Sequence, residues 1–280
     1  MGNVVKGRAT IREVKTLSDL KLVLRLEKET WGLASEDVTP ITLAIALREA
    51  GSIFVGAFDR EELVGFAVAF PSMESGKVGF HSHMLAVRPS HREHGLGEQL
   101  KLAQRQRALE LTVKEMTWTF DPLRGPNAHL NFSKLGVICD SYRVDFYGPG
   151  TSSPLDANGT DRLWVTWRMT SARVEKRLKG NESRAKILEA LRHIEPLVRF
   201  NKDGRPEQGD SERALSRQRV AIEIPGDMNR TERDEIDLAR NWRLVTRQAF
   251  TVALKANFVV KEYCRSIRGE QGPGAYLMER

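Results

Sequence analysis

An arginine and two glycines separate a short apolar segment from a long helical pattern in this 280-residue chain. The apolar segment, residues 84–87, ends before Arg88, and Arg92, Gly95 and Gly97 follow it. Glycine has no Cβ, so its backbone adopts dihedrals that other residues avoid and lets a bulky anion come close. The first amides of the next helix have no partners within the helix and point toward such an anion. The spacing therefore predicts a turn that binds phosphate or pyrophosphate.

Two other phosphate-binding turns are excluded by position and composition. The dinucleotide-binding turn opens the first strand–helix unit and has a third glycine, whereas these glycines follow several predicted strands and lack the third one. A P-loop requires Gly-Lys-Ser/Thr, which does not occur here. The alternative is a plain glycine turn that joins a strand to a helix and binds no ligand.

The order Leu-x-Val-x-Pro-x-x-Arg-x-x-Gly-x-Gly resembles the acyl-CoA loop of the GCN5-related N-acetyltransferase (GNAT) superfamily. The matching residues are Leu85, Val87, Pro89, Arg92, Gly95 and Gly97. The resemblance implies that the strand holds the pantetheine arm of acetyl-CoA, or of another acyl-CoA, and that the loop amides hold its pyrophosphate. The cofactor-binding residues that it implies are Leu85, Ala86, Val87, Arg92, Glu93, His94, Gly95, Leu96, Gly97, Glu98 and Asn127. Arg88 and Lys101 are either further phosphate contacts or solvated surface residues.

Two histidines on the preceding strand are candidate catalytic residues. In the resembled family the general base often lies two residues before the position of Leu85, which is His83 here. Alternate strand residues share a face, so we expect His81, His83, Leu85 and Val87 to point the same way. Histidine titrates near neutral pH and can accept a proton from an amine. The alternative is that both histidines are polar strand residues satisfied by neighbours.

The general acid of the family has no direct counterpart. The family places a tyrosine in the helix after the next strand, a few residues beyond an asparagine that matches Asn127, and Phe132 stands there. Tyr142 is the substitute that we carry as a catalytic candidate; Tyr147, His129 and Ser133 have weaker claims. Asp121 either binds the amine or caps the turn that follows it. We predict no metal site.

The elements that must position these residues form an α/β pattern of the α+β type. The resemblance, over about residues 8–170, implies a mixed, mostly antiparallel sheet flanked by helices in the order β-α-α-β-β-β-α-β-α-β-β. The predicted strands are residues 10–14, 53–59, 63–70, 78–87, 115–120, 137–139, 144–147 and 163–169. The predicted helices begin near Ser18 and Thr39 and cover residues 95–113 and 127–135, the last ending at Gly136.

The remaining residues predict an amphipathic helix at 183–198, a mobile polar loop at 201–210, and a β-α-β-β series. That series resembles the end of the first part, with residues 255–263 matching residues 134–142. We therefore predict a half-repeat of the same fold without a second cofactor site, because no second glycine loop occurs. Any small α/β appendage would give the same order. The predicted domains are a GNAT domain at 1–170, a helical, charged connector at 171–218, and a C-terminal extension at 219–280.

Composition limits the setting and the partners. The net charge is +7, and residues 171–219 hold thirteen Lys/Arg against eight Asp/Glu, but an aromatic content of 7% without a stacking pattern argues against nucleic acid. No stretch approaches the roughly 20 apolar residues of a membrane span, and no signal-peptide pattern opens the chain. Cys139 and Cys264 make neither a disulfide framework nor a metal cluster, so we expect a reduced, cytoplasmic protein. The sequence leaves open whether the chain forms a homodimer.

The predicted function is an acyl-CoA-dependent N-acyltransferase, with acetyl-CoA as the expected donor and a small-molecule or peptide amine as the acceptor. The amine attacks the thioester directly. One alternative is a catalytically weak or inactive acyl-CoA-binding, regulatory module. Another is an acetyltransferase associated with nucleic acid through the basic segment.

Overall fold

The computed structural model describes residues 9–74, 76–92, 94–148, 152–180, 184–269 and 272–280. The contacts divide the chain into two compact units. The first contains Met1–Trp118 and Thr151–Leu155, and the second contains Thr119–Gly150 and Asp156–Arg280. The boundary at Trp118 falls inside a strand. The division into domains at residues 1–170, 171–218 and 219–280 stays a prediction.

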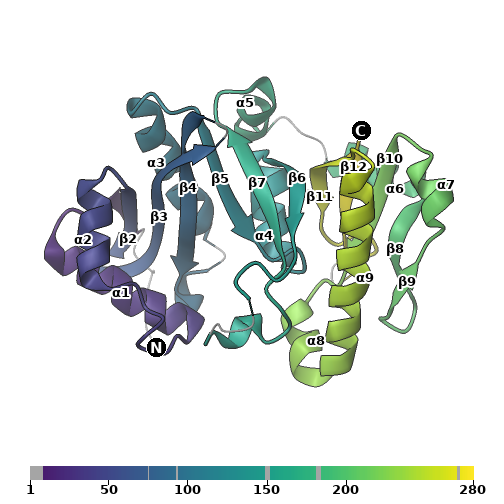
Figure 1. Cartoon of the computed structure of the whole chain (residues 1–280), viewed down its shortest axis with the longest axis horizontal. Helices are drawn as coiled ribbons and strands as arrows, with labels where there is room; N and C mark the ends of the chain where they lie inside the picture. The colour runs from purple at the N-terminus through teal and green to yellow at the C-terminus, as the bar shows by residue number, and fades with distance from the viewer. Residues whose placement is uncertain (1–8, 75, 93, 149–151, 181–183, 270–271) are drawn as a thin grey trace, which may run out of the picture. The chain divides into compact units, whose positions relative to one another are not determined.

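The first unit is built on a sheet whose strands follow chain order (Figure 1). Its strands are β1 (Thr10–Glu13), β2 (Ile53–Asp59), β3 (Glu62–Glu74), β4 (Lys77–Val87) and the first part of β5 (Glu115–Phe120). Neighbouring strands are antiparallel from β1 to β4, and β5 pairs with β4 in parallel. The predicted apolar β segments of this region are therefore confirmed as strands.

Helices pack on both faces of this sheet. On one face, α1 (Leu17–Trp31) and α2 (Ile41–Glu49) share a buried cluster with Phe66 and Val68 of β3. On the other, α3 (Leu96–Glu110) packs on β2, β3 and β4, with Leu100 close to Gly65 of β3. The first turn of α1 starts earlier than predicted, because the Thr16 side chain accepts from the Asp19 amide in a capping box. Helix α3 begins directly after Gly95 and therefore fixes the position of the glycine loop.

The strands of the second unit follow the order β7-β6-β11-β12-β10-β8-β9 (Figure 1). Its strands are β6 (Ile138–Arg143), β7 (Arg162–Arg168), β8 (Pro196–Phe200), β9 (Pro206–Gln208), β10 (Arg219–Ile224), β11 (Val259–Cys264) and β12 (Gly274–Glu279). Its helices and helical turns are α4 (Gly125–Ala128), the π-helical η2 (His129–Leu135), α5 (Ala172–Leu178), α6 (Arg184–Arg192), α7 (Ser211–Leu215), α8 (Met228–Asp234) and α9 (Ile236–Lys255). There are also two short 3-10 helices. The first, η1 (Pro89–His91), follows β4, and the second, η3 (Pro154–Asp156), precedes β7.

Two short segments of the second unit, residues 136–141 and 257–262, correspond at a constant offset of 121 positions. Gly136 ends η2 in the left-handed conformation at φ 73°, and Asn257, 121 positions later, follows α9 at φ 65°. The β6–β7 register shifts between Cys139 and Ser141, and the β11–β12 register shifts 121 positions later, between residues 260 and 262. Cys139 itself pairs with Val260, also 121 positions away. These correspondences support the predicted half-repeat, joined edge to edge at its equivalent strands.

The predicted helix at residues 183–198 is wrong in its second half. Helix α6 ends at Arg192, and Pro196 begins β8, which pairs in parallel with β10. Proline lacks the amide that a helix interior needs and disfavours helical backbone in the residue before it. The predicted polar loop at 201–210 also contains β9, which pairs with β8 as an antiparallel hairpin.

No helix in the described part of the chain is long and apolar enough to cross a membrane.

Candidate active site

The glycine loop closes β4 onto the start of α3. Gly95 is the N-cap of α3 and has φ 73°, the left-handed region that favours glycine. A Cβ at this position would meet only Gln99 Nε2, at 3.9 Å, so the space in front of the helix is open. No side chain among the described residues caps α3. Its first amides therefore face outward as donors for an anion.

The rest of the loop is held by its own polar groups. Arg92 Nε donates to the carbonyl oxygen of Val87 at 3.0 Å, which ties the loop to the end of β4. His94 Nδ1 lies 2.7 Å from the carbonyl oxygen of Arg92. Both side chains are exposed, as is Gly95. The loop thus presents a formed turn rather than a loose segment.

The predicted cofactor residues lie on β4, in the glycine loop and first turn of α3, and on α4. Leu85, Ala86 and Val87 lie on β4, and Ala86 and Leu96 are buried. Gly97 and Glu98 are half-buried in the first turn of α3. Glu93 lies outside the described residues. Asn127 is exposed on α4, in the second unit.

Strands β4 and β5 pair only briefly. Their parallel pairs are Phe80–Met116 and His81–Thr117, and β4 then continues to Val87 without further pairing to the described residues of β5. Along the stretch that includes Leu85 and Val87, the described residues form no strand pairing with the side of β4 that faces away from β3. An extended arm can pair with the free backbone of such an edge. This stretch leads directly into the glycine loop.

A bulge at His83 changes which residues share a face. Ser82 pairs with Ala69 and Met84 pairs with Val68, so His83 is the extra residue. Paired residues point to the same side of a sheet. His81, opposite Phe70, therefore shares the α1 face with Met84 and Ala86, whereas Leu85 and Val87 share the α3 face with Ser82. The expectation that His81, His83, Leu85 and Val87 share one face is corrected.

The two histidines both lie close to the ring of Phe70. The Phe70 ring centroid is 5.4 Å from that of His81 and 5.9 Å from that of His83. His81 is buried, and its Nδ1 lies 3.1 Å from Thr117 Oγ1. Burial, with His83 and Lys101 nearby, lowers the pKa of His81 to about 4. His81 is therefore neutral and a weak proton acceptor at neutral pH.

His83 is the better proton acceptor of the pair. Its side chain reaches solvent from the bulge. The surrounding protein lowers the pKa of His83 below the ordinary histidine value. A neutral, exposed imidazole can take a proton from an amine that approaches from solvent.

A polar cluster under α3 was missed by the sequence analysis. Lys101 is 2% exposed, and its Nζ donates to Ser82 Oγ at 2.7 Å. Ser82 in turn donates to Gln104 Oε1 at 2.9 Å. The expectation that Lys101 is a surface residue or a phosphate contact is corrected, because the side chain points into the sheet. The signal was its spacing: Lys101, Gln104 and Ala108 continue the buried stripe of α3 at intervals of three and four residues.

Arg88, the other extra phosphate contact considered, is engaged by carboxylates. It pairs with Glu29 at 3.1 Å and also with Glu62. Its positive charge is therefore already balanced by groups of the same unit.

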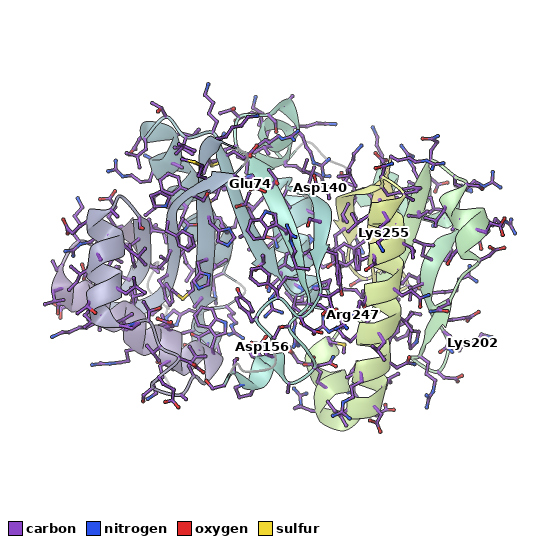
Figure 2. The ribbon with its side chains drawn as sticks, in the orientation of Figure 1. Glu74, Asp140, Asp156, Lys202, Arg247 and Lys255 are labelled. Atoms are coloured by element: carbon purple, nitrogen blue, oxygen red, sulfur yellow. The ribbon has the colours of Figure 1, made fainter. Side chains whose placement is uncertain are left out.

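The remaining candidates belong to a buried network of the second unit. Tyr142 donates to Asp161 Oδ2 at 2.6 Å, and Arg247 of α9 contacts both oxygens of Asp161, at 2.8 and 2.7 Å. Figure 2 shows Arg247 on α9. Burial and the Asp161 charge raise the pKa of Tyr142. The phenol proton is thus committed to a carboxylate.

Asp121 also has its partners within the second unit. Arg243 contacts its two oxygens at 2.7 and 2.8 Å, and the Leu123 amide donates to Oδ1 at 2.9 Å. Of the two predicted roles, the cap of the following turn is observed. The charge of Arg243 lowers the pKa of Asp121 despite its burial. Phe132, in place of the family tyrosine, is fully buried between the rings of Phe120 and Tyr276.

In the described part of the chain, no group of three or more His, Cys, Asp or Glu side chains could hold a metal ion. Both cysteines are buried free thiols.

Comparison with known proteins finds one matching family model. Residues 20–136 match the model of the acetyltransferase (GNAT) family. No protein of curated function matches the chain significantly.

Solved structures resemble more than half of the chain. The ribosomal-protein-S18-alanine N-acetyltransferase from Escherichia coli has 15% identity and a TM-score of 0.46, covering 59% of this chain and 96% of its own. A GNAT family acetyltransferase from Elizabethkingia anophelis, with acetyl-CoA bound, has 18% identity and a TM-score of 0.44, covering 59% and 100%. An acetyltransferase of the GNAT family from Streptococcus pneumoniae has 14% identity and a TM-score of 0.44, covering 56% and 98%. The match to the family model, over residues 20–136, includes β4, the glycine loop and α3.

Proposed function

We propose that the chain is an acetyl-CoA-dependent N-acetyltransferase that acts on the amine of a small molecule or a peptide. The observation that carries the proposal is the parting of β4 from β5 after His81 and Thr117, directly before the glycine N-cap of α3. An extended pantetheine arm fits the open edge of β4, and a pyrophosphate fits the free amides at Gly95. The family match supports the same cofactor.

The chemistry needs a neutral amine more than it needs a strong acid. In the proposed mechanism His83 takes the proton of the acceptor amine, directly or through water. The amine nitrogen then forms a bond to the thioester carbon, and the carbon–sulfur bond breaks. The thiolate leaves and is protonated by solvent, so the buried Phe132 does not prevent the reaction.

His81 and Tyr142 take supporting parts in this proposal. The low pKa of His81, about 4, suits a neutral residue that orients its neighbours through Thr117. The Tyr142 hydroxyl keeps its proton and donates a hydrogen bond to Asp161, which stabilises the second unit.

One observation favours a second function, that of an acyl-CoA-binding module without transfer. The family's acid position holds Phe132, enclosed by aromatic rings, and cannot donate a proton. In that case acetyl-CoA would bind and remain intact.

Thiol release separates the two functions. The chain is mixed with acetyl-CoA and a panel of amines that includes polyamines, aminoglycosides, amino acids and peptides with free N-termini. Release that depends on one class of amine, and that falls in His83→Ala, supports the transferase. Tight binding of acetyl-CoA by calorimetry without release for any amine supports the binding module.

A further inference from the structure

Lys101 is a buried amine that has no carboxylate partner among the described residues. Its side chain is 2% exposed, and its two partners are the Ser82 hydroxyl, at 2.7 Å, and the Trp118 ring, with Nζ 3.6 Å from the ring centroid. Lysine is almost never fully buried unless it is paired with an opposite charge. Neither a hydroxyl nor an indole ring supplies such a charge. The position is costly for a lysine that has only a structural role.

The amine lies at the point where the two central strands part. The last pair of the β4–β5 ladder is His81–Thr117. Ser82 and Trp118 are the next residue on each strand, and Lys101 contacts both. Its Nζ therefore contacts, on each strand, the residue that follows the last pair of the ladder. The bulge at His83 is one residue away from Ser82 on β4.

The protonation state of Lys101 follows from this setting. Burial without an opposite charge lowers the pKa of Lys101 well below the ordinary lysine value. An ordinary lysine is almost entirely protonated at neutral pH and has no lone pair to offer, and each unit of lowering raises the neutral fraction about tenfold. Desolvated lysines of this kind are the nucleophilic lysines of enzymes.

A second buried group beside it lacks a partner. Gln104 is fully buried, and its Nε2 has no hydrogen-bond partner among the described residues, whereas its Oε1 accepts from Ser82. Unsatisfied buried donors are rare and costly. Lys101 and Gln104 meet at the same hydroxyl. An oxygen acceptor that entered beside Lys101 could be bound by this amide.

We propose that Lys101 is an internal acyl acceptor, acetylated by the acetyl-CoA that binds along β4. The inference rests on the proposed function, which supplies the donor. The Nζ lone pair forms a bond to the thioester carbon, the carbon–sulfur bond breaks, and the proton lost by the nitrogen passes to the departing thiolate. The products are N-acetyl-Lys101 and CoA. Gln104 Nε2 then donates to the carbonyl oxygen of the new amide.

The test follows acetyl groups on the chain itself. The full chain is incubated with acetyl-CoA without an added amine, its intact mass is followed with time, and the acetylated residues are located by peptide mapping. We expect one acetyl group per chain, on Lys101, formed at least about tenfold faster than at Lys77, an exposed lysine at the start of β4. Free CoA should slow acetylation of Lys101 and leave that of Lys77 unchanged.

Variants and a binding measurement separate the outcomes. Lys77→Arg should keep the fast acetylation, and Lys101→Arg should lose it. If Lys101→Arg does not fold, the map of the unaltered chain decides alone. Binding of acetyl-CoA by calorimetry, with acetyl groups only on exposed lysines, overturns the internal acceptor and leaves the proposed function standing. Absence of acetyl-CoA binding overturns both.

Discussion

Gly95 is the single residue on which the predicted phosphate turn depends. Its φ of 73° is unfavourable for any residue with a Cβ, by about 1–2 kcal/mol. Gly95→Ala should therefore destabilise the fold by about 1 kcal/mol and weaken acetyl-CoA binding on the order of tenfold, because the amides of the loop would lose their aim. Calorimetric titration with acetyl-CoA measures the second effect.

Gly51 provides a matched control for this change. It also has positive φ, 88°, and a Cβ there would meet nothing within 4 Å, but it lies in the turn between α2 and β2. Gly51→Ala should have a similar effect on stability and none on acetyl-CoA affinity. Equal loss of affinity in both variants would contradict the role of the loop.

His83 should carry the pH dependence of the reaction. The neutral imidazole is the base, so activity is lost as pH falls through the pKa of His83, which lies below the ordinary histidine value of 6.5. His83→Gln should lower kcat/KM by about 100-fold and remove that limb of the pH profile, with acetyl-CoA affinity unchanged. Initial rates across pH 5–8, about the range in which histidines titrate, check the prediction. A limb that persists in His83→Gln would assign the base to another group.

The role of a residue could be predicted from sequence where it depends on neighbours in the chain. It could not be predicted where it depends on how strands pair. The turn at Gly95 needs only its own sequence. The faces of His81, Leu85 and Val87 depend on a bulge that is set by pairing between β4 and β3. Lys101 was expected to be either a phosphate contact or a solvated surface residue, and only the packing of α3 on the sheet shows that it is buried.

At the scale of elements, α9 is attached to its own unit through arginines. Arg243 and Asp121 form a buried, two-contact ion pair, at 2.7 and 2.8 Å, with side chains 4% and 10% exposed. Arg243→Met should destabilise the chain by about 3–5 kcal/mol, because the Asp121 carboxylate stays buried without its main partner. Chemical denaturation measures the change.

Arg240, on the same helix, is the control for this prediction. Its pair with Asp237 spans 3.2 Å between side chains that are 63% and 92% exposed. Arg240→Met should change stability by less than about 0.5 kcal/mol. Similar losses in the two variants would show that helix α9 responds to the loss of any arginine rather than to the buried pair.

Elements were predicted well where one pattern dominates. The apolar strands β2, β3 and β4 and the turn at the start of α3 match their predicted places. Residues 183–198 combine a helical apolar pattern with a proline, and the proline determines the outcome: α6 stops and β8 begins at Pro196. The strand is then fixed by pairing with β10, more than twenty residues later, which no local pattern shows.

At the scale of the whole chain, the half-repeat was visible as a faint likeness between residues 134–142 and 255–263. The structure adds features that sequence cannot show: equal bulges, equal left-handed turns at Gly136 and Asn257, and the pairing of Cys139 with Val260. A shared backbone feature needs no shared side chain, since asparagine also tolerates the left-handed region. The likeness between the two segments is therefore clearer in the backbone than in the sequence.

Stability of the folded chain should fall in mild acid. The pKa of His81 is lowered to about 4, and that of His129 also to about 4, each mainly by burial. Between pH 6.5 and 4 the unfolded chain binds protons that the folded chain does not, so stability decreases as pH falls. His81 alone contributes up to about 3 kcal/mol to this loss.

Urea unfolding at pH 7 and pH 5 measures this slope. His81→Gln should reduce the slope, while His193→Gln, at a side chain that is 75% exposed, should leave it unchanged. An unaltered slope in His81→Gln would contradict the assignment of the loss to His81.

A crystal structure of the chain with acetyl-CoA bound tests the central claim most directly. The account predicts that the pantetheine arm lies along β4 beyond His81, with the pyrophosphate on the amides at Gly95 and the thioester near His83 and Lys101. Acetyl-CoA bound elsewhere on the chain, with the edge of β4 left empty, would contradict it.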